Sequence, residues 1–242
     1  MTGAIIQSRV ASTRLPDKVL MDIAGKPMAL RVVERLKMSQ KLDNVVLAIP
    51  DTKENDVLEI LAQENLLDFF RGPEQDVLER YFEAAKHFKV ETIVRITSDC
   101  PFIDPEVADE IIMRHFLTKA DYTSNVIERT FPRGLDVEVF SFSVLEKAFK
   151  EAREEHQREH VTPYFFENPD IFKTENIEAK GVLRRPDLRL TVDTKEDMEL
   201  ARKIYSHFGE KFFSTREVVE FLDKNPELKA INAKVQQKEL KE

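Results

Sequence analysis

The order of hydrophobic patterns along the chain is the feature that most constrains its fold. Short apolar runs at 4–8, 44–49 and 92–97 have the length and composition of buried parallel strands. Segments with apolar residues at helical spacing lie between them, as in 54–64. This alternation predicts an α/β fold with a Rossmann-like, doubly wound and mostly parallel sheet. Ligands of such sheets bind beyond the carboxyl ends of the strands.

The remaining elements follow from the same patterns. Helices are predicted at 28–37, 76–88, 105–116, 143–153, 160–168, 195–208 and from residue 215 onward. Further strands are predicted at 135–140, where the alternation indicates one exposed face, and at 188–192. Because no internal repeat or low-complexity linker interrupts the chain, residues 1–242 are expected to form one domain. The charged end, 236–242, is expected to fray.

Composition excludes several classes of function. A formal net charge of −8 disfavours nonspecific binding to nucleic acid, which requires clustered cations. No apolar stretch reaches the roughly 18 residues that a membrane helix needs, and 1–14 lacks the apolar run of a signal peptide. Cys100 is the only cysteine, so we expect no intrachain disulfide and a buried thiol rather than a nucleophile. The expectation is a cytoplasmic protein without nucleic-acid or membrane partners.

A basic loop directly follows the first predicted strand. It places Arg9, Arg14 and Lys18 within ten residues, together with small hydroxyl residues such as Ser12. Guanidinium groups match phosphate oxygens in bidentate fashion, and hydroxyl and backbone N–H groups also donate. A solvated basic turn explains any one of these cations, but three together in an acidic protein favour a polyphosphate site. The glycines of a Walker A loop or a dinucleotide fingerprint are absent.

Two carboxylates each follow a predicted strand. Asp99 comes after the run at 92–97, and Asp193 comes after the run at 188–192. One or two carboxylates together with substrate phosphates are enough to bind Mg²⁺. The alternatives are an Asx turn before a proline for Asp99 and a helix cap for Asp193. Two such carboxylates facing one basic loop favour metal-assisted phosphoryl chemistry.

The segment after the fourth predicted helix departs from the preceding alternation of strands and helices and is the expected acceptor region. Asp136 and Glu138 share one face of a predicted strand, with Arg133 just upstream. Their carboxylates suit sugar hydroxyls, and the arginine suits an acid or a phosphate. An exposed strand face with ordinary charges explains them equally well. His160, close to Thr162, is expected either to contact substrate or to lie at a subunit interface.

Several segments match one protein family in order along the chain. They are 4–28, 72–78, 98–101, 131–138, 158–163 and 189–193. Together they resemble the cytidylyltransferases of the branch named for spore coat polysaccharide biosynthesis protein F. The CMP-ketodeoxyoctonate and CMP-acylneuraminate synthetases are related to this branch. The matches cover most of residues 4–203, and the ordered set is far more specific than any single segment.

The resemblance implies a fold of the nucleotide-diphospho-sugar transferase type, a homodimer, and a small inserted acceptor and dimerisation segment at about 121–175. The residues that it implies for the triphosphate of CTP are Arg9, Ser12, Arg14 and Lys18, with Arg71, Gly72 and Ser98 around the rest of the nucleotide. Asp99 and Asp193 would bind Mg²⁺, and Arg133, Asp136, Glu138 and His160 would face the acceptor. The ketodeoxyoctonate cousins have glycine where this chain has Ser98, which leaves the acceptor sugar open.

The predicted reaction is transfer of CMP from CTP to a sugar or sugar acid with release of pyrophosphate, for surface polysaccharide or glycoconjugate synthesis. Arg9, Arg14, Lys18 and Asp99 would be the catalytic residues, acting by charge neutralisation and positioning. One alternative is a nucleotide-sugar-dependent glycosyltransferase, although a nucleoside diphosphate-sugar needs fewer cations than the basic loop supplies. Another is a non-catalytic nucleotide-binding protein of the same fold, which would bind CTP but release no pyrophosphate.

Overall fold

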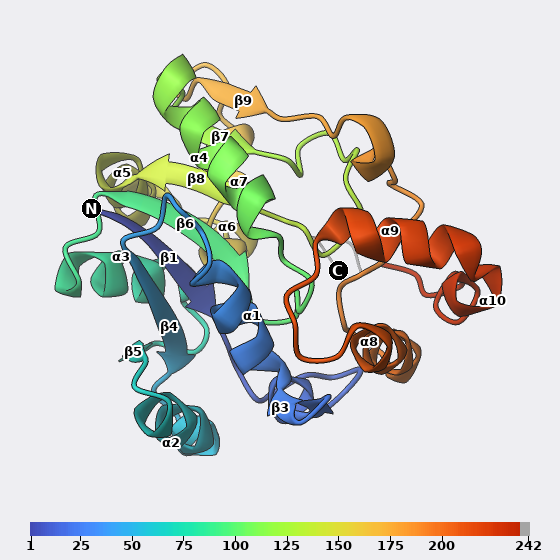
Figure 1. The fold of residues 1–242 in the computed structure, drawn as a ribbon. Helices are drawn as coiled ribbons and strands as arrows, with labels where there is room; N and C mark the ends of the chain where they lie inside the picture. The colour runs from blue at the N-terminus through green and yellow to red at the C-terminus, as the bar shows by residue number, and fades with distance from the viewer. Residues whose placement is uncertain (238–242) are drawn as a thin grey trace.

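The computed structural model describes residues 1–237, which fold around one seven-stranded sheet (Figure 1). The strand order is β5-β4-β1-β6-β8-β7-β9. Its strands are β1 (Thr2–Gln7), β4 (Asn44–Pro50), β5 (Asp68–Gly72), β6 (Thr92–Thr97), β7 (Tyr122–Ser124), β8 (Glu138–Ser141) and β9 (Thr174–Asn176). The first four in this list are parallel, β8 is antiparallel to both β6 and β7, and β9 is parallel to β7. The strands β2 (Asp22–Ile23) and β3 (Lys26–Pro27) form a separate antiparallel pair.

Helices cover both faces of the sheet. They are α1 (Met28–Leu36), α2 (Asp56–Glu64), α3 (Val77–His87), α4 (Pro105–Thr118), α5 (Phe142–Glu151), α6 (Glu155–His160), α7 (Pro163–Phe166), α8 (Lys195–Phe208), α9 (Thr215–Lys224) and α10 (Pro226–Lys229). Buried residues of α1, α4, α8 and α9 form one hydrophobic cluster with one face of the sheet. Buried residues of α3, α5 and α7 form a second cluster with the other face. The doubly wound, mostly parallel α/β fold is therefore confirmed.

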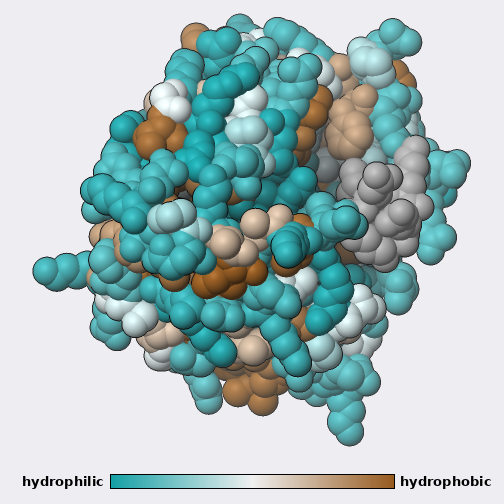
Figure 2. Space-filling model, turned by 90° about the vertical axis from the view of Figure 1, so that its right-hand side faces the viewer, coloured by the Kyte–Doolittle hydropathy of each residue, from teal (hydrophilic) through white to brown (hydrophobic). Residues whose placement is uncertain are grey.

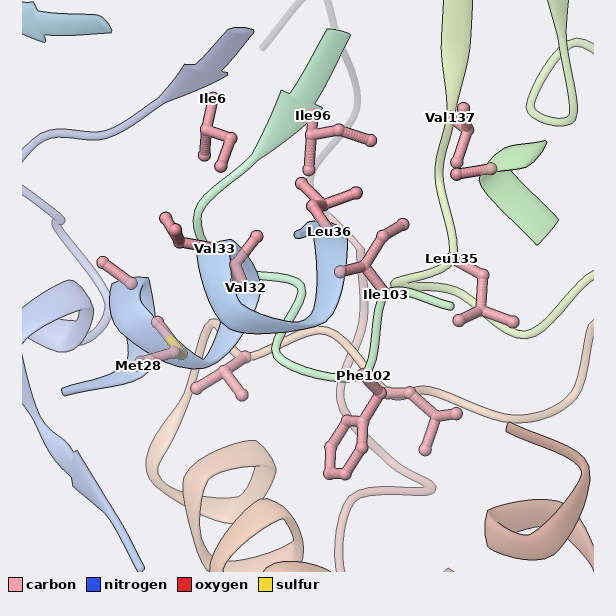
Figure 3. Close-up of a cluster of buried hydrophobic side chains, with 14 of the residues drawn as sticks. Ile6, Met28, Val32, Val33, Leu36, Ile96, Phe102, Ile103, Leu135 and Val137 are labelled. Atoms are coloured by element: carbon pink, nitrogen blue, oxygen red, sulfur yellow. The ribbon is translucent and has the colours of Figure 1, made fainter. Parts of the chain in front are cut away.

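Alternate side chains of the central strands explain why both clusters form. Ile6 of β1 and Ile96 of β6 face the first cluster, where Val32 and Leu36 of α1 pack nearby (Figure 3). Ile5 of β1 belongs to the second cluster. Because strands buried on both faces need apolar residues at nearly every position, these strands read as continuous apolar runs in the sequence.

The topology locates the switch point between β1 and β6. From β1 the chain moves outward to β4 and β5, and it then returns to the other side of β1 as β6. The Ser98 N–H donates to the Gln7 carbonyl at 3.1 Å, which holds the carboxyl ends of these two strands together. The basic loop follows β1 and Asp99 follows β6, so both lie where doubly wound sheets bind their ligands.

Three predictions of secondary structure are wrong. The segment 188–192 is no strand, because it passes beyond the end of the sheet and makes only one isolated bridge, between Arg189 and Arg133. The strand predicted at 135–140 begins only at Glu138 and is buried on both faces, because Val139 packs in the first hydrophobic cluster and Phe140 in the second. The helix predicted at 160–168 is replaced by α6 and α7, which meet at Val161.

Other expectations have mixed outcomes. The segment 121–175 contributes β7, β8 and most of β9 to the main sheet, and its acceptor and dimerisation roles stay predictions. Among residues 1–237, no helix is long and apolar enough to cross a membrane. The face shown in Figure 2 is largely hydrophilic, with scattered hydrophobic residues. Most of the end predicted to fray, from residue 238 onward, lies outside the described residues.

Candidate active site

The ammonium group of Lys18 joins the two carboxylates that the sequence singled out. Lys18 Nζ donates to Asp99 Oδ2 at 2.9 Å, to Asp193 Oδ1 at 2.7 Å and to the Val192 carbonyl at 2.9 Å. Lys18 opens a short 3₁₀ helix at the end of the basic loop and is only 9% exposed. The structure therefore brings together the basic loop and both predicted metal ligands, although 175 residues separate Lys18 from Asp193.

Asp193 is the most heavily bound carboxylate of this cluster. Its Oδ2 atom accepts from the Arg189 guanidinium at 2.6 Å and forms an ion pair with the Arg14 guanidinium at 2.9 Å. Arg189 in turn pairs with Asp197 at 2.9 Å, and Asp197 caps α8 in a capping box with Thr194. The predicted cap role therefore belongs to Thr194 and Asp197, which leaves Asp193 free to face the basic loop.

The C-terminal segment reaches the same cluster. The Asn232 amide donates to the Arg189 carbonyl at 3.0 Å and to Asp197 Oδ1 at 2.8 Å. Gln237 Oε1 accepts from Arg189 at 2.8 Å, and the Gln236 carbonyl lies 3.4 Å from the Arg14 guanidinium. Residues 232–237 thus border the site through Arg189, Asp197 and Arg14.

Charge shifts the protonation equilibria in this cluster. Burial opposes ionisation of Asp99, but Lys18 and hydrogen bonds from Thr97 and Cys100 outweigh it and lower the pKa of Asp99. Burial likewise opposes the charged form of Lys18, and the attraction of Asp99 and Asp193 outweighs it and raises the pKa of Lys18. Lys18 and Asp99 are therefore both charged at neutral pH, as phosphate and metal binding require.

The two carboxylates fit a magnesium ion that arrives with its nucleotide. An oxygen of Asp99 and an oxygen of Asp193 already converge on one cation, Lys18 Nζ, within 2.9 Å. Within residues 1–237, no group of three or more His, Cys, Asp or Glu side chains gathers as a complete metal site. Mg²⁺ suits such a pair, since it keeps several waters and completes its shell with substrate phosphates.

The rest of the basic loop faces solvent. Arg9 is exposed, and in the part of the chain that the structure describes it makes no ion pair. Ser12 is half-buried, and its hydroxyl accepts from the Leu15 N–H at 3.4 Å. Arg9 therefore remains open to an anionic ligand, whereas Ser12 also stabilises the loop itself.

The residues predicted to surround the rest of the nucleotide are less well placed. The Arg71 guanidinium binds Asp56 and Glu59 of α2, each at 2.6 Å, so its side chain is committed to that helix. Ser98 is only 5% exposed and joins β6 to β1 through its backbone. Gly72 ends β5, where an added Cβ would lie 3.1 Å from Arg80 Cγ. Contact of these three residues with the nucleotide stays a prediction.

The predicted acceptor residues separate into two groups. Arg133 is half-buried, and its guanidinium forms no ion pair within residues 1–237. Burial and the neighbouring charge of Arg129 lower the pKa of Arg133. Asp136 is bound in bidentate fashion by Arg129 at 2.6 and 2.7 Å. Arg133 thus remains available for an anion next to the Asp193 cluster, while Asp136 already has a partner.

Glu138 does not lie on an exposed face as the alternation predicted. Its side chain is buried between β6 and β7, and the residue is 4% exposed. One carboxylate oxygen pairs with Arg95 of β6. The other accepts from the Tyr122 hydroxyl at 2.5 Å and from the Thr162 hydroxyl at 2.7 Å. The expectation of an exposed carboxylate is therefore wrong, and its direct contact with an acceptor stays an untested prediction.

Comparison of the sequence with known proteins decides the family. The sequence profile described as "Cytidylyltransferase" matches residues 3–238. The chain belongs to the cytidylyltransferase family. A protein of Methanocaldococcus jannaschii is 41% identical over 240 residues, covering 98% of this chain and 97% of that protein. The spore coat polysaccharide biosynthesis protein SpsF of Bacillus subtilis is 35% identical over 229 residues, covering 92% and 94%.

Solved structures agree with this assignment. A cytidylyltransferase from Leptospira borgpetersenii superposes with a TM-score of 0.90 at 34% identity, covering 98% of this chain and 99% of that one. A CMP-2-keto-3-deoxy-manno-octonic acid synthetase complexed with CTP gives a TM-score of 0.66 at 18% identity, covering 86% of this chain and all of that one. The first supports both family and fold, and the second supports the fold alone. Nucleotidyltransferase activity follows from the family.

Several residues of this cytidylyltransferase's site were missed by the sequence analysis. Arg189 pairs with Asp193, Arg129 pairs with Asp136, and Arg95 pairs with Glu138. Asp197 in turn pairs with Arg189. Only Thr194-x-x-Asp197 left a local signal, the spacing of a capping box. Of the other pairs, those of Arg189 and Arg129 span four to eight positions and Arg95–Glu138 spans 43, and none of them leaves a periodic pattern. Cys100 is buried as expected, and burial raises the pKa of its thiol.

Proposed function

We propose that this cytidylyltransferase transfers CMP from CTP to a sugar or sugar acid and releases pyrophosphate. One observation carries the proposal: Asp99, Asp193, Lys18 and Arg14 converge at the switch point of the sheet. Such a cluster of two carboxylates and two cations matches a metal-bound triphosphate. The name of the M. jannaschii relative gives no substrate, so the proposal rests on the site and the family.

The residues of the cluster divide the work of binding and charge neutralisation. Arg9 is exposed on the basic loop, Arg14 faces Asp193, and both bind the β- and γ-phosphates. Asp99 and Asp193 hold Mg²⁺, which stabilises the negative charge of the triphosphate when it is bound. Lys18 lies between the carboxylates, and its ammonium, whose three N–H groups donate to Asp99, Asp193 and the Val192 carbonyl, adds positive charge beside the α-phosphoryl group.

The reaction needs no protein nucleophile. The acceptor oxygen forms a bond to the α-phosphorus, and the bond between that phosphorus and the bridging oxygen breaks. Pyrophosphate leaves with the electron pair, and the proton of an acceptor hydroxyl passes to solvent. Positioning and preorganised charge supply the catalysis. The buried Cys100, with its raised pKa, takes no part as a nucleophile.

The acceptor carries a negative charge in this proposal. Arg133 is half-buried beside the Asp193 cluster and within residues 1–237 has no carboxylate partner. A sugar acid or a sugar phosphate would satisfy it. The SpsF relative is named for spore coat polysaccharide biosynthesis, which supports a role of the product in surface polysaccharide or glycoconjugate synthesis.

A screen for pyrophosphate release tests the proposal. The full chain is incubated with each of the four nucleoside triphosphates, with Mg²⁺ or EDTA, and with a panel of sugar acids, sugar phosphates and neutral sugars. We expect release only with CTP, Mg²⁺ and an anionic sugar. Pyrophosphate release with neutral sugars but not with anionic ones would refute the proposed role of Arg133. CTP binding without pyrophosphate release in the presence of any acceptor would refute the reaction. A homodimer and a cytoplasmic location remain predictions from the sequence.

A further inference from the structure

The backbone at Val161 adopts a conformation that valine rarely accepts. Its φ of 70° and ψ of −56° are those of a γ-turn with positive φ. The Thr162 N–H closes this turn by donating to the His160 carbonyl at 2.8 Å. A β-branched side chain at positive φ is a genuine outlier. Such strain persists only where the surrounding structure enforces it, and it concentrates at functional sites.

Two contacts enforce the turn from either side. On the N-terminal side, Arg158 of α6 pairs with Asp76, which caps α3 immediately after the loop that follows Gly72. On the C-terminal side, the Thr162 hydroxyl donates to Glu138 Oε1 at 2.7 Å. Val161 itself is fully buried in the second hydrophobic cluster. The turn is thus fixed between the predicted nucleotide loop and the predicted acceptor strand.

The contact between Thr162 and Glu138 is itself anchored in the centre of the sheet. Glu138 pairs with Arg95, which lies directly opposite it in the register of β6 and β8. Tyr122 of β7 donates to the same Glu138 oxygen as Thr162. A carboxylate with three partners has little freedom to rotate, so it offers Thr162 a rigid acceptor. The strained turn is therefore tied to the strand that leads to Asp99.

We propose that Glu138 and Thr162 are positioning residues for the acceptor, because their contact holds the strained turn at Val161 and so fixes the direction of His160. His160, which the sequence predicted to bind the acceptor, directly precedes this turn and lies between its two anchors. The inference rests on the proposed function for its kinetic consequence, while the geometry of His160 can be measured without any substrate. Glu138 thereby serves the acceptor indirectly.

The decisive variant is Thr162→Val, which removes the hydroxyl but keeps the size and branching of the side chain. Thr162→Ser restores the hydroxyl. Thr123→Val is the matched control, because Thr123 is equally buried and its hydroxyl bonds His115, 3.0 Å away on the other side of β7. Glu138→Gln keeps the shape of the Glu138 side chain but removes its charge. It serves as a second variant if Thr162→Val does not fold.

Two measurements test the inference. The first is the NMR signal of the histidine rings in the ligand-free chain, with His160 assigned from its loss in His160→Gln. We expect Thr162→Val to move the His160 signal and Thr162→Ser to restore it, whereas Thr123→Val moves only the His115 signal. The second is the rate of pyrophosphate release. With the anionic sugar found by the screen, we expect Thr162→Val to raise the acceptor KM about tenfold with an unchanged CTP KM.

The outcomes separate this inference from the function on which it rests. An unmoved His160 signal, or an unchanged acceptor KM in Thr162→Val, would overturn the positioning role. A loss of thermal stability and of kcat with an unchanged acceptor KM would also overturn it, because it would show a structural role alone. If none of the acceptors leads the wild-type chain to release pyrophosphate, the proposed function fails. The NMR signals of the histidine rings still decide how His160 is held.

Discussion

Replacing Lys18 by methionine is the sharpest test of the charge arrangement at the site. Methionine keeps the length and the apolar stem of the side chain but removes its charge. The ammonium of Lys18 is the cation shared by Asp99 and Asp193, at 2.9 and 2.7 Å. The Lys18 side chain is 11% exposed, and those of Asp99 and Asp193 are 25% and 12% exposed. Water therefore compensates little for the missing charge.

The expected magnitude follows from this burial. Removing one partner of a buried ion pair costs about 3–5 kcal/mol, because the remaining charge stays buried and uncompensated. Arg14 and Arg189 still neutralise part of Asp193, so we expect the lower end, about 3 kcal/mol. If Mg²⁺ replaces the lost cation, saturating metal should restore up to about 2.7 kcal/mol at one hundred times its dissociation constant.

Urea unfolding of the wild type and of Lys18→Met, each with EDTA and with Mg²⁺, measures both quantities. Lys26→Met is the matched control, since Lys26 pairs with Glu34 at the surface, where their side chains are 38% and 45% exposed. An exposed pair of this kind contributes less than about 1 kcal/mol, and Mg²⁺ should not affect its loss. A Lys18→Met variant as stable in EDTA as the control would refute the reasoning, as would an absence of rescue by Mg²⁺.

Three further predictions follow from the site and its surroundings. Asp99→Asn should lower pyrophosphate release at least about a hundredfold in a folded protein. The pKa of Asp99 is lowered from 3.8 to about 2, so its ionised form stabilises the wild type above pH 4 and this stability is lost toward pH 2. Acid titrations of the Asp99→Asn variant should therefore lack this part of the pH dependence. In calorimetry, Arg14→Ala should weaken CTP binding more than CMP binding. Arg71→Ala should have little effect on the binding of either nucleotide, because the Arg71 side chain is paired with α2. Gly134→Ala should cost more than about 3 kcal/mol in urea, since its φ is +102° and its Cβ would lie 2.5 Å from a backbone nitrogen, whereas Gly25→Ala, with φ of +88° and open space, should cost about 1 kcal/mol. Equal losses within any of these pairs would contradict the geometry.

The parallel half of the fold could be predicted because its signals are local. The run at 92–97 coincides with β6, and the helix predicted at 195–208 coincides with α8. Both depend on apolar periodicity over one segment of the chain. The short strands β7 and β9 could not be predicted in this way, since three residues carry no periodicity. Their strand character comes only from the neighbours with which they pair.

The candidate site was predictable in its centre and not at its edges. Asp99 was found because it follows a recognisable strand. Lys18 was found because it belongs to a basic loop that follows another recognisable strand. Glu138 was misplaced because alternation reveals that one face of a strand differs from the other, but not whether partners such as Arg95, Tyr122 and Thr162 cover the polar face. Arg95, which supplies that cover, appeared in the sequence only as an interruption of an apolar run.

The contact of the C-terminal segment with Arg189 determines where the protein can be handled without disturbing its chemistry. Gln236 and Gln237 lie beside Arg14 and Arg189, so a fluorophore attached at either residue would sit next to the site. The N-terminus lies at the far end of β1, where the amino group of Met1 pairs with Glu91 (Figure 1). A tag placed there would disturb one exposed ion pair and leave the catalytic edge of the sheet open.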